Sequence, residues 1–310
     1  MVTEWRTALS ARPEASRTAV QPQRAWKRPR GRRIQRLLVL LLAVLVGSLV
    51  WLVTIPWPPH VETVSGTWRP PPGGYLALQP VGSYAQLPDD AKAAAMVHRS
   101  SWENRPDNAT SNRTVPASMH LRPTVVRMRA YDPLWNRNVL ARISGRYTGT
   151  TDEIIQWAAA KWGLPDDTLR AVAVMESDWH QGKQGDFVDD RSRCLPGYAE
   201  VPCPLSFGIA GVRSNSWQGS FPAIRNSTAA NLDVLGGWLR GCYEGWVWWL
   251  RDHGNTSRGA YRSGDLWGCV GAWYSGNWHD DGALGKQGGE DYIQRALNWH
   301  TLKPWLGTGY

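Results

Sequence analysis

The sequence predicts a mainly α-helical fold for the second half of this 310-residue chain. Thr150 and Glu153 form a capping box, in which each side chain can satisfy a free backbone amide at the start of a helix. Apolar residues then recur at one-turn spacing, and these are Ile154, Ala158 and Trp162. No convincing two-residue alternation follows residue 150. We therefore expect helices to build the core of residues 150–310.

Further helices are expected in order along this half. Gly163 ends the first helix, and Pro165 followed by two aspartates starts a second one that runs to Ser177. Its run Ala171–Met175 leaves little polar face, which predicts a buried helix. Later helices are expected at 228–251 and 290–301, with a shorter one at Val270–Tyr274.

Positive charge is concentrated at the start of the chain. Residues 1–36 contain ten Lys and Arg against two acidic residues, so this tail carries +8 of the formal net charge of +9. The remaining residues are nearly neutral, which argues against a basic groove for nucleic acid. A composition of 42% apolar and 20% charged residues also excludes a wholly disordered chain.

An uncharged stretch, Leu37–Trp57, follows the basic tail. A helix of this length spans the roughly 30 Å hydrocarbon core, so we expect a transmembrane helix. The basic tail predicts a cytoplasmic N-terminus and an extracytoplasmic C-terminal part of a single-pass membrane protein. The alternative, a cleaved signal peptide, would have a shorter apolar stretch and a small-residue cleavage site.

Two segments are expected between the membrane and the helical domain. Residues 58–86 are rich in Pro and Gly and predict a linker that lifts the domain off the bilayer. Residues 87–149 are expected to be an extended segment that wraps the domain, with one short helix at Asp89–His98. The helical domain itself is expected at 150–310.

All four cysteines follow residue 150, on the expected exterior side, where disulfides persist. Four cysteines allow three pairings. Proximity in sequence favours Cys194 with Cys203 and Cys242 with Cys269. Buried free thiols are the alternative. No ligand spacing among the cysteines and histidines indicates a metal site, and no cofactor is expected.

Glu176 is the candidate catalytic residue. It lies four residues after Val172 and seven after Leu169, on the stripe of the second helix that should face the core. Burial there would raise the pKa of its carboxyl group and favour the protonated form that a general acid needs. The alternative from spacing alone is a glutamate at a frayed helix end that turns to solvent.

Five segments, in order, resemble the motifs of lytic transglycosylases, a lysozyme-like family. The first joins Gly163–Pro165 to Glu176–Trp179, in which a Glu-Ser pair ends a buried helix as it does at the family's catalytic glutamate. The other four are Ser206–Val212, Asn231-Leu232 with Trp238-Leu239, Ala272–Gly276, and Tyr292–Leu297. The resemblance covers about 150–300 and implies a lysozyme-like helical domain.

The resemblance implies a peptidoglycan-cleaving enzyme that acts on glycan strands through Glu176 alone. The family protonates the glycosidic oxygen and then uses the same group as a base, while the muramoyl 6-hydroxyl attacks C1. Substrate contacts are expected from residues in and beside the motifs. They are Ser177, Trp179, Ser206, Gly208, Ile209, Tyr274, Trp278 and Tyr292, with the two tryptophans offered for stacking on sugar rings.

Two departures and one additional acid leave other functions open. Gly211 replaces the family's usual glutamine, and Ser275 replaces an asparagine. Asp189, in an acidic loop with Asp186 and Asp190, would make the enzyme a lysozyme-type hydrolase if it faced Glu176 and activated a water. A wall-binding module without catalysis is the alternative from another class, but it would have no need of a buried carboxylate.

Overall fold

A computed structural model describes residues 69–122, 133–253, 259–282, 287–307 and 310. The chain divides into two compact units, Met1–His60 and Val61–Tyr310, and only the second contains described residues. The expected basic tail at 1–36 and transmembrane helix at 37–57 lie outside the described residues. Within the described ranges, no helix is both long and apolar enough to cross a membrane.

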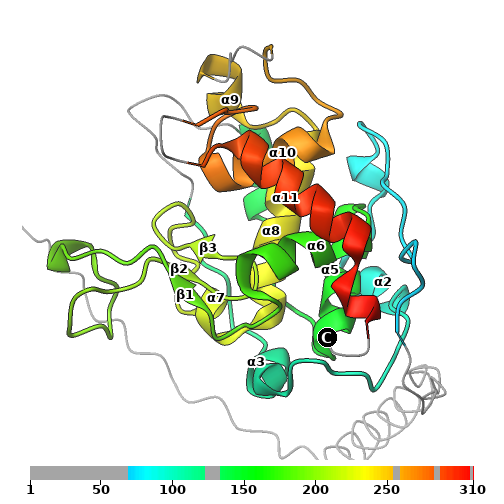
Figure 1. The fold of residues 1–310 in the computed structure, drawn as a ribbon, viewed down its shortest axis with the longest axis horizontal. Helices are drawn as coiled ribbons and strands as arrows, with labels where there is room; N and C mark the ends of the chain where they lie inside the picture. Colours follow the sequence, from blue (N-terminus) through cyan, green and yellow to red (C-terminus); the bar gives the residue numbers. More distant parts are fainter. Residues whose placement is uncertain (1–68, 123–132, 254–258, 283–286, 308–309) are drawn as a thin grey trace, which may run out of the picture. The chain divides into compact units, whose positions relative to one another are not determined.

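The second unit is mainly helical, as the sequence predicts (Figure 1). Its helices are α2 (Asp90–Ala95), α3 (Ala109–Asn112), α4 (Pro133–Trp135), α5 (Thr151–Trp162), α6 (Asp166–Ser177), α7 (Ala223–Asn226), α8 (Thr228–Tyr243), α9 (Trp248–His253), α10 (Leu266–Ser275) and α11 (Gly289–Leu302). Short 3-10 helices occur at η1 (Tyr84–Gln86), η2 (Pro106–Asn108), η4 (Arg191–Arg193) and η5 (Pro304–Leu306), and a π-helical segment occurs at η3 (Asn136–Leu140).

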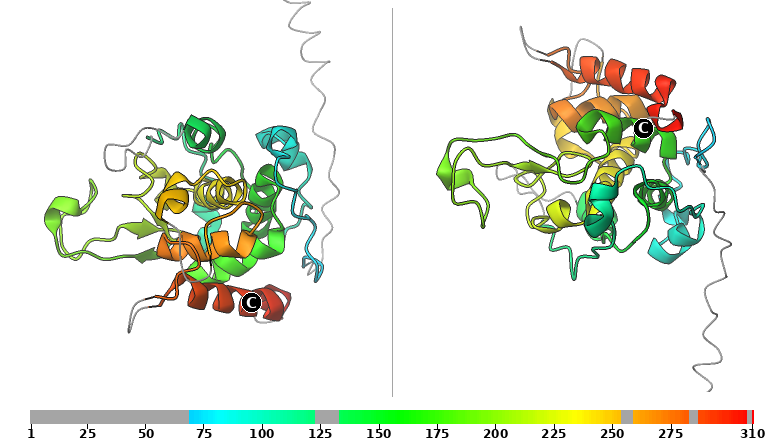
Figure 2. Two further views of the ribbon diagram at one scale, coloured as in Figure 1. Left: turned by 90° about the horizontal axis from the view of Figure 1, so that it is seen from above. Right: turned by 60° about the horizontal axis from the view of Figure 1, so that its bottom comes forward.

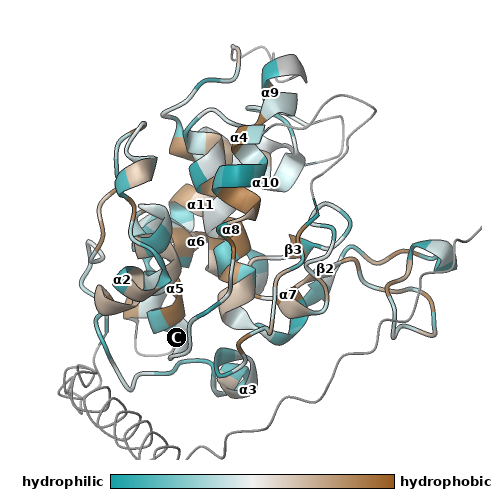
Figure 3. Cartoon of the chain, turned by 180° about the vertical axis from the view of Figure 1, so that it is seen from behind, coloured by the Kyte–Doolittle hydropathy of each residue, from teal (hydrophilic) through white to brown (hydrophobic). Residues whose placement is uncertain are grey.

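The five long helices form the core. α5 packs against α6 and α8, α6 packs against α11, and α10 lies between α8 and α11. Hydrophobic residues gather on the helices that meet at the centre, including α6 and α8 (Figure 3). α6 is thus covered by other elements along most of its length, which confirms the prediction of a buried helix.

The local signals for α5 and α6 are confirmed. The Thr150 hydroxyl accepts a hydrogen bond from the Glu153 amide at 3.3 Å, and the Glu153 carboxylate accepts one from the Thr150 amide at 2.9 Å. Gly163 ends α5 in the left-handed conformation, with φ of +64°. A side chain there would collide with Leu87, since its Cβ would lie 2.5 Å from Cδ2 of that residue.

A small sheet that the sequence analysis did not predict precedes α7. Its strands β1 (Gln184–Gly185), β2 (Ser206–Phe207) and β3 (Val212–Arg213) pair antiparallel in the order β1-β2-β3. A strand of two residues is too short to produce an alternation that can be recognised in sequence. Between β1 and β2 the chain forms a long arm, residues 186–205, that projects from the helices in both views of Figure 2.

Two predicted helices have different bounds. The helix expected at 228–251 is broken at Glu244–Val247, where Gly245 has φ of +86°, so α8 and α9 are separate. The short helix expected at Val270–Tyr274 begins earlier, at Leu266, because the Asp265 carboxylate caps it by accepting from the Gly268 amide at 2.8 Å.

The linker prediction is wrong for residues 69–86, which pack against the helical body. The guanidinium of Arg240 donates to the carbonyls of Gln79 and Pro80, both at 2.9 Å. The Gln79 amide donates to the Gly163 carbonyl at 2.9 Å, and the Gly82 amide to Glu244 at 2.8 Å. This Pro- and Gly-rich segment is therefore an extended strap. Several of its backbone N–H and C=O groups form hydrogen bonds to charged residues of the helical body.

A buried arginine cluster joins this strap to α5 and α6. Arg170 is fully buried and contacts Asp152 at 2.8 Å, Asp166 at 2.6 Å and Asp167 at 2.9 Å. The Asp166 carboxylate also accepts from the amides of Tyr75 and Leu76 at 3.0 Å. One guanidinium thus holds together two helices and a segment about ninety residues earlier in the chain.

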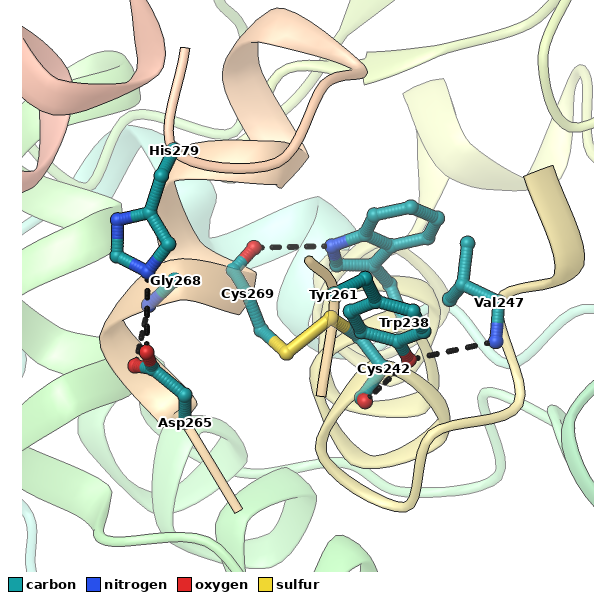
Figure 4. Close-up of a disulfide and its surroundings, with 8 residues drawn as sticks. All are labelled: Trp238, Cys242, Val247, Tyr261, Asp265, Gly268, Cys269 and His279. Carbon is teal, nitrogen blue, oxygen red and sulfur yellow. Dashed lines mark hydrogen bonds and ion pairs between the residues drawn. A yellow bond between two sulfur atoms is a disulfide. The ribbon is translucent and has the colours of Figure 1, made fainter. Parts of the chain in front are cut away.

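The predicted disulfide pairing is confirmed. Cys194 is bonded to Cys203 within the projecting arm, and Cys242 is bonded to Cys269. The second bond joins the end of α8 to the first turns of α10 (Figure 4). Trp238 supports the same junction, because its indole N–H donates to the Cys269 carbonyl at 3.3 Å.

The arginine cluster predicts a large loss of stability in Arg170→Met. Removing the guanidinium would leave Asp152 and Asp166 buried without their cation, which typically costs about 3–5 kcal/mol, while Asp167 would keep its contact with Lys303. Lys92→Met is the control, because Lys92 and Asp89 form an exposed pair 4.0 Å apart, and such pairs contribute about 0–1 kcal/mol. Urea unfolding followed by tryptophan fluorescence measures both. Equal losses in the two variants would contradict the role given to Arg170.

Candidate active site

A cavity of about 370 Å³ lies beside the C-terminal end of α6. One wall comes from β1, β2 and β3 and the residues next to them, and it is largely polar. The opposite wall consists of tryptophans that come from five separate parts of the chain. They are Trp135, Trp217, Trp238, Trp249 and Trp273. Such a volume, with an apolar wall and a few polar groups, is typical of a small-molecule site.

Glu176 lines this cavity, one residue before the end of α6. Burial raises the pKa of its carboxyl group to about 7, although hydrogen bonds from Tyr292 and Trp273 oppose the shift. The negative charge of Asp186 adds to the rise, and the positive charge of Arg295 acts against it. A carboxyl group with a pKa in this range has both its protonated and its ionised form accessible near neutral pH, so it can either donate or accept a proton.

Two tyrosines adjoin Glu176. Tyr292, from α11, is almost fully buried and donates its hydroxyl hydrogen to Glu176 Oε1. Burial and the neighbouring Glu176 raise the pKa of Tyr292 well above its usual value, so it stays a donor. Tyr274, from α10, stacks on Tyr292 with ring centroids 4.8 Å apart, lines the cavity and is 45% exposed. Tyr274 can thus contact a ligand, whereas Tyr292 holds Glu176 from behind.

The segment Ser206–Gly211 forms the polar wall beside Glu176. Ser206 and Gly208 line the cavity, as predicted for substrate-binding residues. Ile209 does not, because it is fully buried. Ser177 is also absent from the wall. Its hydroxyl donates to the Ile209 carbonyl at 2.9 Å, so these two residues fasten α6 to the segment instead of binding a ligand.

The buried amide of Asn231, on α8, sets the shape of this segment. Its side-chain nitrogen donates to the Phe207 carbonyl at 2.7 Å, and its oxygen accepts from the Ala210 amide at 2.8 Å. Gly208, with φ of +82°, lies so close that a Cβ would be 2.2 Å from the Asn231 nitrogen. The glycine is therefore needed both for its backbone conformation and for the approach of Asn231.

Gly211 is also required by its surroundings. Its φ is +63°, and a Cβ would lie 2.6 Å from Glu176 Oε2. A glutamine at this position would occupy the space of the Glu176 carboxylate as it is placed here. Ser275, at the other departure from the motifs, donates its hydroxyl to the Asn277 carbonyl at 3.0 Å and is not part of the cavity wall.

The two tryptophans predicted for the cleft are core residues. Trp179 is fully buried, donates to the Arg170 carbonyl at 3.1 Å and stacks on Trp305. Trp278 is 1% exposed and packs edge-on against Tyr261. Nearness to a motif in sequence was misleading, because the chain reverses at Trp179, where φ is +66°, and turns the ring beneath α6.

None of the tryptophans that line the cavity was among the residues predicted to contact substrate. Trp273 had the clearest signal, since it directly precedes Tyr274 in the fourth motif. Trp238, on α8, belongs to the third motif. The remaining three lie on α4, on α9 and in the loop after β3, and no motif includes them. Long-range packing alone brings them together, with Trp238 and Trp249 centroids 5.3 Å apart.

Asp189 does not face Glu176. It is exposed on the projecting arm, beyond the bridge between Val188 and Cys203, and does not line the cavity. Asp186 does line it, from the residue after β1, and forms a 3.1 Å ion pair with Arg213 of β3. The second acid in this site is therefore Asp186. It lies at the start of the arm, three residues before Asp189.

The described part of the chain contains no group of three or more His, Cys, Asp or Glu that could hold a metal ion. The polar groups of the cavity thus provide two carboxylates, a buried phenol behind one of them, and the cations of Lys183 and Arg213 at the sheet. This set can carry out proton transfer on a bound ligand.

The contact between Gly211 and Glu176 predicts coupling between substitutions at the two positions. Gly211→Ala should reduce stability more than Gly276→Ala, because both sites have positive φ but only Gly211 has an atom within 4 Å of the added Cβ. Strain alone costs about 1–2 kcal/mol at such a site. In a Glu176→Ala background, this excess loss of stability in Gly211→Ala over Gly276→Ala should disappear. A double-mutant cycle by denaturant unfolding measures it, and a persistent excess would contradict the assigned contact.

Comparisons of the chain with protein-family models, with curated proteins and with solved structures found no match. The functional assignment therefore depends on the motifs in the sequence and on the chemistry of the cavity. Its central feature is a carboxyl group with a pKa of about 7, placed between an aromatic and a polar wall.

Proposed function

We propose that this chain is a lytic transglycosylase with a lysozyme-like domain that cleaves the β-1,4 bond between MurNAc and GlcNAc in peptidoglycan. The observation that carries the proposal is Glu176, a glutamate with a pKa of about 7 that lines a cavity rich in tryptophan. It ends a buried helix within a Glu-Ser pair, as the resemblance implies for a catalytic acid. No metal or cofactor enters the proposed reaction.

Glu176 performs both proton transfers in this mechanism. Its protonated carboxyl group gives a proton to the glycosidic oxygen as the bond from that oxygen to C1 breaks, which creates positive charge at C1. The resulting carboxylate then takes the proton of the C6 hydroxyl while that oxygen bonds to C1. The acid is regenerated, a 1,6-anhydro sugar forms, and no water is consumed.

The two walls match the two faces of a sugar. A pyranose ring has apolar C–H surfaces that pack on indole rings, and the partly exposed Trp249 and Trp273 are the members of the aromatic wall most open to a ligand. Hydroxyl and amide groups of the sugar can pair with Ser206 and with the polar residues that flank β1. Tyr274, at the mouth, offers both a ring and a hydroxyl.

The location proposed for this activity is the exterior face of a bacterial cell membrane. The uncharged stretch 37–57 would anchor the chain, with the basic tail inside. Two disulfides within the folded unit are consistent with an oxidising compartment. Glycan strands of the wall would then be within reach of the cavity.

A lysozyme-type hydrolase is the second candidate, because Asp186 shares the cavity with Glu176. As a carboxylate it could remove a proton from a water that attacks C1, and the product would then be a reducing sugar. Its ion pair with Arg213 occupies one of its oxygens. A non-catalytic wall-binding module is a third outcome, in which the cavity binds glycan without cleavage.

Glu176→Gln tests the catalytic assignment. The substitution removes the acidic proton of the carboxyl group but nearly preserves the shape of the side chain. Cleavage of purified peptidoglycan should therefore fall by about 10²–10⁴-fold with folding intact. Asp189→Asn is the matched control and should retain activity, because Asp189 is exposed outside the cavity. In the wild type, kcat/KM should fall as pH rises through about 7, since the acid loses its proton. Undiminished cleavage by folded Glu176→Gln would refute the assignment.

Asp186→Asn separates the two enzymatic candidates. For a transglycosylase, cleavage persists and the fall of kcat/KM with pH moves to lower pH, because the charge of Asp186 contributes to the raised pKa of Glu176. Mass spectrometry should find wild-type products one water lighter than hydrolysed muropeptides. Hydrated products together with an inactive Asp186→Asn would establish the hydrolase. Binding of glycan strands without any product would establish the wall-binding module.

A further inference from the structure

His279 occupies an unusual position between two carboxylates. Its Nε2 lies 3.0 Å from Asp265 Oδ2, and its Nδ1 contacts Glu290 Oε1 (Figure 4 shows the first pair). The three side chains are only 14–23% exposed. A neutral imidazole carries one N–H, so it can donate to only one of these acids. Both contacts are satisfied together when the ring is an imidazolium.

The two carboxylates belong to the first turns of neighbouring helices. Asp265 is the N-cap of α10, and Glu290 is the second residue of α11. His279 follows α10 in the chain and thus joins the start of α10 to the start of α11. The two helices are already close, since a Cβ on Gly271 of α10 would lie 2.7 Å from Ile293 of α11.

These helices carry the two tyrosines that adjoin the candidate acid. Tyr274 is the penultimate residue of α10, and Tyr292 lies in the first turn of α11, two residues after Glu290. Their rings stack nearly parallel, with an interplanar angle of 11°, and Tyr292 holds Glu176. A shift of α11 relative to α10 would therefore disturb the hydrogen bond to Glu176.

We propose that His279 is a positioning residue whose imidazolium clasps the first turns of α10 and α11, and thereby holds Tyr292 on Glu176. The clasp closes when the ring is protonated and loosens when it loses a proton. The orientation of the candidate acid then depends on pH through a residue outside the cavity. Only the kinetic consequence of this inference rests on the proposed function.

The charges around His279 favour this protonated state. Although burial lowers the pKa of the imidazole, hydrogen bonds to Glu290 and Asp265 and the charges of the two acids raise it above its usual value. Asp280 and Asp281 are its neighbours along the chain, and the Asp280 carbonyl accepts from the Glu290 amide at 2.9 Å. The two side chains that contact the ring, Asp265 and Glu290, are therefore acidic, and so are the two residues that follow His279 in the chain.

The sign of the pH dependence follows from the raised pKa. The clasp contributes its full stabilisation below about pH 6.5, the ordinary value for histidine, and loses it as pH rises through the higher folded pKa. Loss of the clasp weakens the hydrogen bond from Tyr292, which by itself holds the pKa of Glu176 down. Breaking the clasp should therefore raise the pKa of Glu176.

The test is NMR of the full-length chain in detergent, with labels on Glu side chains, Tyr rings and His rings. In the wild type, nuclear Overhauser contacts between Tyr274 and Tyr292 should weaken in step with deprotonation of His279. In His279→Gln, the acid dissociation constant of Glu176 should fall by about twofold or more, as expected for loss of one hydrogen bond. His180→Gln is the control, since His180 pairs with a single exposed carboxylate, Asp107, outside α10 and α11.

Glu290→Gln separates the clasp from a long-range charge effect. Removing a negative charge would by itself lower the pKa of Glu176, whereas a broken clasp raises it. In the kinetic arm, kcat of His279→Gln on peptidoglycan should be reduced below pH 6.5, with KM little changed. A wild type that does not cleave glycan would overturn the proposed function only. Tyrosine contacts that persist unchanged through the titration of His279, or a Glu176 pKa that does not rise in Glu290→Gln, would overturn the clasp.

Discussion

The ion pairs of the Arg170 guanidinium are the contacts on which the rest of the domain depends. It neutralises three buried aspartates and so fixes α6 against α5, while Asp166 holds the strap that precedes them in the chain. The cost of removing these charges from water is offset only when all partners are present. The N-terminal end of α6 is therefore rigidly placed, and the helix carries that placement to Glu176 at its other end.

Polar groups that take no part in the proposed catalysis set the positions of the residues around Glu176. Asn231 holds the segment that forms the polar wall, and Ser177 fastens α6 to it. Glycines at 208 and 211 allow backbone to approach Asn231 and Glu176 more closely than any side chain would permit. The candidate acid is thus held by its hydrogen bond to Tyr292 and by close backbone contact at Gly211. Burial raises the pKa of its carboxyl group to about 7, although the hydrogen bond opposes that rise.

The candidate site draws its two walls from parts of the fold with different constraints. The aromatic wall depends on α8 and α10, which the bond between Cys242 and Cys269 joins. The polar wall depends on a sheet of very short strands, from which the projecting arm extends. The pair Tyr274 and Tyr292 connects the cavity to α11, and His279 lies at the far end of that connection. Chemistry in the cavity and packing of the helices are coupled through these few residues.

Local signals in the sequence located the long helices, although not the break between α8 and α9 or the start of α10, and they singled out the candidate acid. The capping box at Thr150, the glycine at 163 and the apolar stripe that includes Glu176 each involve neighbours along the chain, and the proximity of the cysteines predicted both disulfides. Only the tertiary structure decided which tryptophans line the cavity, that Asp186 rather than Asp189 enters it, and that the Pro/Gly-rich segment after residue 69 is a strap. These outcomes depend on contacts between residues far apart in sequence, where a chain reversal or a buried charge, and not a local period, determines which side chain faces the cavity.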